Sequence, residues 1–223
     1  MRFRVLFSFI LLAAIPSAGF SADFNADLEG VELIVGNAII LNAEDVSVSD
    51  APSPIKAFFG VSVPMTFTDI FYFEPGFRVY STYVTLETVD GEFKAVPAAV
   101  DTVDRMSVFN CEIRPELGAI FHLNEKISMG ITGAPVFTLR FPLTAYDEAD
   151  SDDKATIREY YYSNARFLGL WAGGFFSWSF GESTTLRLKA GTNLPVYHLW
   201  DGDDAAFYDQ MIIEPEIGFV FRF

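Results

Sequence analysis

The residues from 211 to 223 alternate between apolar and polar positions. Every second residue from Ile213 onward is apolar, and Glu214, Glu216 and Arg222 occupy positions between them. A period of two predicts a β-strand whose two faces lie in different environments. Any fold for this chain has to give a row of Ile and Phe side chains one environment and a row of charges another.

Seven earlier segments show the same alternation, so the sequence predicts eight strands. The connections between them alternate between short turns at 68–69, 124–125 and 181–183 and longer acidic loops, of which 144–159 is the most acidic. This asymmetry is typical of an all-β, eight-stranded, antiparallel, up-and-down transmembrane β-barrel, with both termini periplasmic and four loops outside. The earlier predicted strands are 30–41, 56–66, 71–80, 109–122, 127–141, 161–180 (apolar on both faces, so its register stays open) and 186–197.

Composition favours the same fold. The chain is 51% hydrophobic and yet has a formal charge of −15. Residues 1–21 have the charged start, apolar centre and small-residue end of a cleaved signal peptide, which leaves 22–223 as one domain. Beyond residue 21 no apolar run is long enough for a membrane helix, and in lipid only helices and closed barrels satisfy their backbone polar groups.

A soluble, lipocalin-like barrel is the alternative interpretation of the same strands. It would turn the apolar faces inward and leave the charges outside. An eight-stranded barrel has too little interior for so many large apolar side chains. We therefore expect the apolar faces to contact lipid and the polar faces to line the interior.

The last strand also resembles the closing strand of bacterial outer-membrane barrels. In those proteins a terminal Phe follows hydrophobic residues at every second position, and the barrel-assembly machinery reads this signal. Here the matching residues are Ile217, Phe219, Phe221 and Phe223. The resemblance implies an outer-membrane location in a diderm bacterium, with membrane lipid and the assembly machinery as partners.

The predicted interior faces carry both signs of charge, near balance when Glu32, Lys56 and Lys126 are included. Buried charges of opposite sign have to be paired, so a structural network is the first interpretation, and substrate binding by the same residues is the second. The predicted lumen charge network comprises Glu74, Arg78, Glu112, Arg114, Glu116, Arg140, Arg187, Lys189, Glu214, Glu216 and Arg222.

In size and layout the chain is similar to the OmpW family, which implies passage of small hydrophobic molecules through the barrel. An apolar pocket formed by Phe167, Trp171 and Phe175 would serve that role. The alternative function is surface adhesion through the acidic outer loops. Rings of aromatic residues are expected at both membrane borders, with Tyr160 and Tyr161 in the outer one.

Other classes of function have little support in the sequence. The two histidines, His122 and His198, are expected at opposite ends of the barrel, so no catalytic residues, no cofactor and no metal site are predicted. The acidic segment 147–153 lacks the glycine and the final glutamate of a calcium loop. A strongly acidic chain also argues against nucleic-acid partners, because phosphate contacts need clustered Lys and Arg. The oligomeric state stays open.

Overall fold

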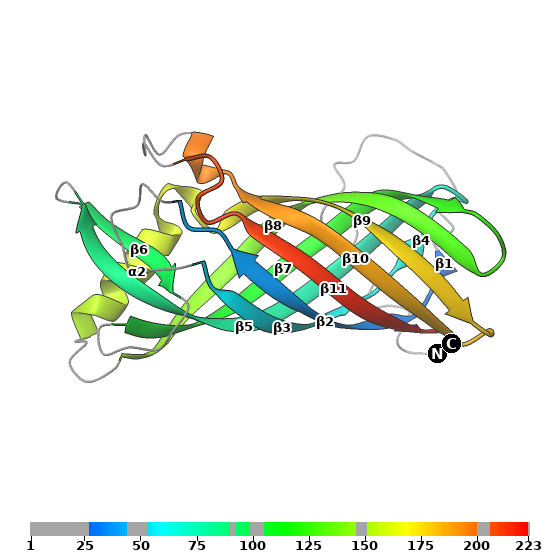
Figure 1. The fold of residues 1–223 in the computed structure, drawn as a ribbon, viewed down its shortest axis with the longest axis horizontal. Coiled ribbons are helices and arrows are strands. Elements are labelled where there is room, and N and C mark those ends of the chain that lie inside the picture. Colours follow the sequence, from blue (N-terminus) through cyan, green and yellow to red (C-terminus); the bar gives the residue numbers. More distant parts are fainter. Residues whose placement is uncertain are drawn as a thin grey trace, which may run out of the picture.

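Eight long strands form a closed antiparallel barrel in the computed structural model (Figure 1). The structure describes residues 27–43, 53–89, 92–98, 105–145, 151–199 and 206–222. The predicted signal peptide and Phe223 lie outside these ranges. The barrel strands are β2 (Val31–Ile40), β3 (Ile55–Ser62), β5 (Phe71–Val89), β7 (Arg105–His122), β8 (Ile127–Ala145), β9 (Leu168–Phe180), β10 (Thr184–Pro195) and β11 (Ile212–Phe221).

Each barrel strand pairs with its neighbours in sequence, and β11 closes the ring against β2. In that closing pair Ile217 lies opposite Val35, and Phe219 lies opposite Leu33. The predicted fold class is therefore confirmed. Short strands extend the ring locally: β1 (Asp27–Leu28) pairs with β4 (Met65–Thr66), and β4 pairs with β5. The predicted strand 56–66 is thus interrupted between Ser62 and Met65, where Pro64 has no N–H to donate.

The outer surface of the barrel is apolar along its length. Its exposed side chains are those that the alternation assigned to lipid, and they come from every barrel strand. The soluble interpretation is therefore wrong, because it requires these faces to be buried. Exposed examples include Leu33, Val35, Phe59, Phe77, Ile113, Leu117, Met129, Ile131, Phe137, Phe141, Leu170, Phe176, Leu188, Ile217, Phe219 and Phe221.

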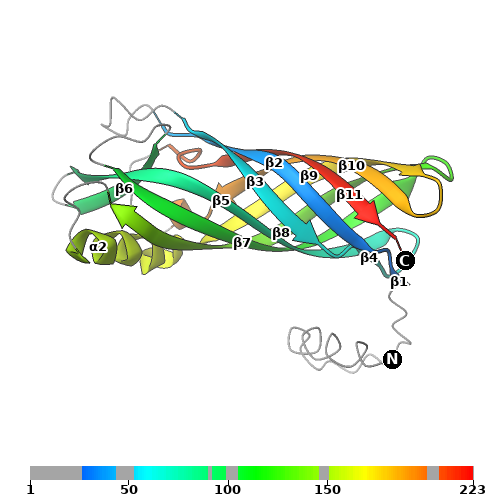
Figure 2. The same cartoon turned by 90° about the horizontal axis from the view of Figure 1, so that it is seen from below.

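The two ends of the barrel are built differently (Figure 2). At the end where β1 begins and β11 finishes, tight turns join the strands, and the side chains of Thr68 and Asn124 accept hydrogen bonds from backbone N–H groups two and three residues later. Gly181 supplies the left-handed backbone (φ 70°) of the turn between β9 and β10. We call this the turn end.

The opposite end, which we call the outer end, carries additional structure. β6 (Glu92–Ala98) pairs with the extension of β5, and α2 (Ser151–Tyr162) is followed by the short helix η1 (Ser163–Ala165). A further short helix, η2 (Tyr197–Leu199), follows β10. The acidic loop predicted for 144–159 is therefore helical from Ser151, and the strand predicted from residue 161 starts only at Leu168.

A compact hydrophobic cluster explains the helix. Ile157, Tyr160 and Tyr161 stand three and four residues apart, so they share one helix face. They are buried against residues of β5, β6 and β7, which corrects the prediction that Tyr160 and Tyr161 belong to a membrane-border ring. Burial raises the pKa of the Tyr161 hydroxyl above its ordinary value. The outer cluster comprises Val84, Ala95, Met106, Val108, Ile157, Tyr160 and Tyr161. None of the helices in the described ranges is long and apolar enough to cross a membrane.

Candidate functional site

The barrel interior holds ten buried charged residues that form one connected group. We call them the interior network. They come from β2, β5, β7, β10 and β11, whose inward positions follow the same alternation that exposes apolar residues outside. The members are Glu32, Glu74, Arg78, Glu112, Arg114, Glu116, Arg187, Lys189, Glu214 and Glu216.

Arg114 forms the centre of the first half of the network. From β7 it crosses the bore to β11, which lies four strands away in either direction around the ring. Its Nη1 donates to Glu214 Oε2 at 2.6 Å, and its Nη2 donates to Glu216. The Nε atom lies 3.1 Å from Glu116 Oε1 on its own strand. One guanidinium therefore ties opposite walls of the barrel together.

Arg78 joins the same group from β5. Its Nη2 donates to Glu216 Oε2 at 2.8 Å, and its Nε donates to Glu216 Oε1 at 3.1 Å. This two-point contact uses the planar shape of the guanidinium, which gives both strength and a fixed geometry. Nη2 also lies 3.3 Å from Glu116 Oε1, so Arg78 and Arg114 share both of these carboxylates.

Glu74 is the acceptor at the centre of the second half. Arg187 Nη1 lies 2.6 Å from Glu74 Oε2, and Lys189 Nζ lies 2.8 Å from Glu74 Oε1. β5 and β10 are also opposite each other in the ring, so these contacts again span the bore. Lys189 continues to Glu116 Oε2 at 3.0 Å and thereby connects the two halves.

Two polar side chains, those of Tyr72 and Ser62, complete the network and were not singled out from the sequence. Tyr72 donates its hydroxyl to Glu74 Oε2 at 2.9 Å, and Ser62 donates to Glu32 Oε2 at 2.9 Å. Glu32 also accepts from Arg187 Nη1 at 3.2 Å. Tyr72 and Ser62 both lie at inward positions of the alternation. The sequence pattern therefore predicted that they point into the barrel, but not that they donate hydrogen bonds to these glutamates.

The middle of the interior is closed to water. Glu74, Arg114 and Glu116 have relative exposures of 0%. Contacts across the bore leave no continuous passage at this level, which agrees with the small interior of an eight-stranded barrel. The close fit extends to the backbone, because a Cβ at Gly218 would stand 1.8 Å from Glu32 Oε1.

The predicted apolar pocket is instead filled by packing. The Trp171 ring centroid lies 3.7 Å from the guanidinium carbon of Arg114, and Trp171 Nε1 donates to Thr132 Oγ1 at 2.9 Å. Phe175 packs edge-on against Tyr72, with ring centroids 5.3 Å apart. Phe167 packs near the Tyr162 ring, away from both. These aromatic side chains support the interior network rather than line an empty space.

Two predicted members of the charge network lie elsewhere. Arg222 is exposed near the turn end, where its Nη2 donates to Ser179 Oγ at 3.4 Å. Arg140 is half-buried near the outer end, over the ring of Tyr161. The alternation correctly placed both residues on inward-facing positions. However, Arg140 and Arg222 lie too far along the barrel axis from the glutamates of the interior network to contact them.

The interior network is therefore not charge-balanced, contrary to the sequence-based expectation. It holds six glutamates against three arginines and one lysine. Lys56 and Lys126, which the balance included, are half-buried and exposed. The excess acid is concentrated where Glu112 and Glu214 approach Arg114: in each of the two, Oε1 has no hydrogen-bond partner among the described residues.

The remaining candidates lie apart from the interior network. His122 is exposed at the turn end, whereas His198 Nε2 lies 3.0 Å from the backbone oxygen of Asp209 near the outer end. Cys111 is half-buried on β7. In the described ranges no group of three or more His, Cys, Asp or Glu residues is arranged to hold a metal ion. The predicted assembly-signal residues Ile217, Phe219 and Phe221 face outward on β11.

Comparison with known proteins extends the fold assignment. No protein-family model matches the sequence, and no curated protein matches it. The structure is similar to Neisserial surface protein A (NspA), with a TM-score of 0.52, 9% identity, and coverage of 89% of this chain and 99% of NspA. Ail, the attachment invasion locus protein of Yersinia pestis, was solved with a heparin analogue and matches with a TM-score of 0.42 and 10% identity over 87% of this chain and 99% of Ail.

At such low identity the likeness to NspA concerns the fold alone. Membership of the OmpW family is not shown by these comparisons and stays a prediction. What the ring of strands, the apolar outer surface and the likeness to NspA establish together is the architecture: the chain has the eight-stranded transmembrane β-barrel fold of small outer-membrane proteins.

Proposed function

We propose that this protein is an integral outer-membrane protein of a diderm bacterium whose barrel serves as a closed anchor and whose outer end binds a partner at the cell surface. The observation that carries the proposal is the contrast between the water-free middle of the bore and the additional folded structure at the outer end. An anchor alone requires neither β6 nor α2. The outer cluster holds these elements in a defined shape, as a recognition surface requires.

The charge of the outer connections indicates the chemistry of the partner. Segment 147–153 alone contains five acidic residues, and Asp201, Asp203 and Asp204 belong to another connection. Residues 146–150 and 200–205 lie outside the described ranges, and residues 151–153 form the first turn of α2. Acidic loops favour a partner with a basic surface, because complementary charge accelerates encounter and opposes wrong partners.

Binding by intact cells tests the proposal. Cells that display the wild-type protein are compared with cells in which Asp147, Asp150, Asp152 and Asp153 are replaced by Asn, and both are exposed to a basic matrix protein or polylysine. We expect the variant to lose most of its binding at low salt. A matched control neutralises Asp69, Glu125 and Glu182, which sit at the turn end. Equal loss in both variants, or no loss in the outer variant, contradicts the proposal.

Passage of small hydrophobic molecules is the second candidate function. It rests on two small cavities near the outer end, whose walls include Leu168, Pro195 and Ile212. Planar-bilayer recordings and uptake by liposomes separate the two candidates. A closed anchor gives no conductance above the lipid baseline and no saturable uptake, whereas either signal from the wild-type protein favours passage.

A further inference from the structure

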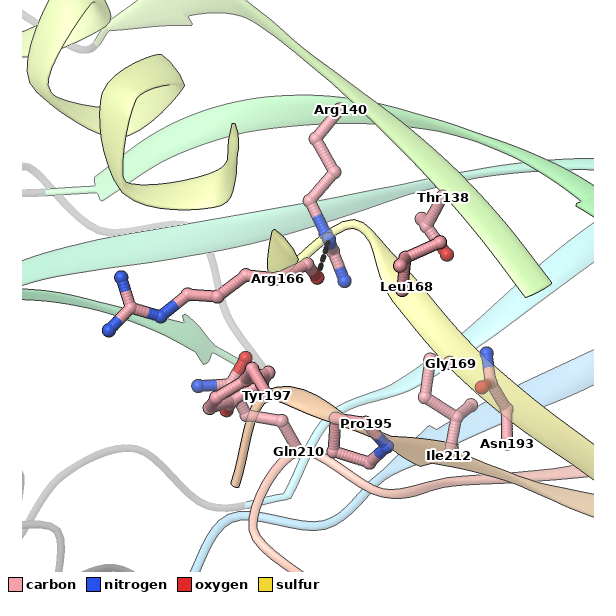
Figure 3. Close-up of a pocket in the computed structure, with 10 residues that line it drawn as sticks. All are labelled: Thr138, Arg140, Arg166, Leu168, Gly169, Asn193, Pro195, Tyr197, Gln210 and Ile212. Carbon is pink, nitrogen blue, oxygen red and sulfur yellow. Dashed lines mark hydrogen bonds between the residues drawn. The ribbon is translucent and has the colours of Figure 1, made fainter. Parts of the chain in front are cut away.

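A cavity at the outer end of the bore is lined by polar residues from several different segments (Figure 3). It accommodates about 20 Å³, which is room for about one or two water molecules. Arg140 reaches toward it from β8, which also contributes Thr138. The other polar residues of the lining are Arg166 before β9, Asn193 on β10, Tyr197 on η2 and Gln210 before β11. Leu168, Pro195 and Ile212 supply apolar wall.

Arg140 differs from the bases of the interior network. In the described part of the chain no carboxylate lies within ion-pair distance of its guanidinium, whereas each of the four network bases contacts at least two glutamates. Its guanidinium makes one hydrogen bond there, from Nη1 to the Arg166 backbone oxygen at 3.2 Å, and it stacks 4.5 Å from the Tyr161 ring centroid. A guanidinium has five N–H donors, so most of its capacity remains for an acceptor.

Tyr197 contributes a second donor with no acceptor. It is 3% exposed, and its hydroxyl has no hydrogen-bond partner among the described residues. A buried hydroxyl left in this state costs free energy unless a ligand or water satisfies it. Burial raises the pKa of this hydroxyl, so it stays protonated and able to donate. The acidic neighbour Asp209 is engaged elsewhere, because its Oδ1 accepts from the Ala43 amide at 2.8 Å.

We propose that this cavity binds the carboxylate group of a small organic acid, with Arg140 and Tyr197 as its donors. A carboxylate presents two acceptor oxygens and is smaller than a tetrahedral phosphate, so it suits this small space better. On its other side Arg140 borders a second cavity of about 10 Å³, which is too small for the same group. The apolar wall suits the carbon chain of the acid. This proposal does not depend on the surface-binding function above.

Titration of the purified protein in a neutral, sugar-based detergent tests the site. Acetate and hexanoate are added at constant ionic strength against chloride, and the side-chain Nε–H resonances of arginine are followed by NMR. We expect a saturable shift of one arginine in the millimolar range, which is typical for a ligand of so few atoms. If hexanoate binds more tightly than acetate, the natural ligand is a longer-chain acid. If the two bind equally, the natural ligand is a short-chain acid.

Three variants locate the ligand. Arg140→Gln should weaken binding at least about tenfold, because a charge-assisted hydrogen bond is lost. Tyr197→Phe should weaken it about threefold to tenfold while preserving the packed ring. Lys126→Gln, a base removed at the turn end, should leave it unchanged. A shift that never saturates, or saturable binding that Tyr197→Phe leaves intact, overturns the proposal even when Arg140→Gln fails to fold.

Discussion

The interior network and the outer cluster occupy the same barrel and are stabilised in opposite ways. In the network, ten charged residues replace a hydrophobic core, and long side chains reach across the bore to the opposite wall. In the outer cluster, seven apolar and aromatic residues from three strands and a helix pack as in a soluble protein. The difference follows from the surroundings: lipid receives the large apolar side chains of the outward faces, so the inward positions can hold charged residues, with smaller apolar clusters beside them.

This contrast has an energetic consequence. Buried ion pairs contribute little net stability compared with apolar packing, but removal of one partner leaves an unpaired charge at high cost. Apolar packing loses stability in proportion to the contacts removed and the cavity left behind. The two regions should therefore respond differently to single substitutions.

The largest effect is expected for Arg114→Ala. The change leaves Glu214 and Glu216 without their cross-bore partner, and we expect the free energy of unfolding to fall by about 3–5 kcal/mol. The loss of stability is measured in detergent as a lower unfolding midpoint, from the heat-dependent mobility shift on gels. Arg222→Ala is the matched control, since that side chain is exposed. Equal midpoints for the two variants would contradict the assignment of Arg114 to the centre of the network.

Ile157→Ala tests the outer cluster by itself. Loss of this fully buried side chain should destabilise the packing of α2 by about 2–5 kcal/mol. Because α2 lies outside the ring of strands, the barrel midpoint should change little, while protease cleavage within the outer end becomes faster. Tyr162→Ala, on the exposed side of the same helix, is the control. A barrel midpoint lowered as much as in Arg114→Ala would mean that the two regions unfold as one unit.

The smallest effect is expected for Glu112→Gln. The network has more acids than bases, and the shortest contact of Glu112 with Arg114 is 3.5 Å. Removal of this charge should leave the unfolding free energy within about 1 kcal/mol of wild type. Glu74→Gln, which takes the shared partner from Arg187 and Lys189, should cost about 3 kcal/mol or more. Both losses of unfolding free energy are measured by chemical denaturation. A larger loss for Glu112→Gln than for Glu74→Gln would show that the charge excess is not located at Glu112.

Most of the strand assignment was predictable because a period of two is a local property. It placed Phe219 and Phe221 outside and Glu214 and Glu216 inside before any contact was known. The alternation also placed Arg140 and Arg222 on inward positions. It does not, however, predict where along the barrel axis a residue lies. Whether an inward charge reaches a partner depends on the register of strands that are distant in sequence.

The helix was missed for a related reason. The acidic residues before Lys154 resemble a solvated loop, and the spacing of Ile157, Tyr160 and Tyr161 is a short helical pattern with few supporting residues. A helix of this length owes its stability mainly to packing. Val84 and Met106, which cover it, lie more than forty residues before it in the sequence.

The sequence by itself determined the barrel class, the apolar outer surface and the set of charged residues that face inward, because alternation and turn chemistry act between neighbouring residues. The tertiary structure decided which charges meet, how the bore closes and where Arg140 is left without a carboxylate among the described residues. These features require closure of β11 on β2, which brings strands from both ends of the chain into one ring and fixes which side chains share a level.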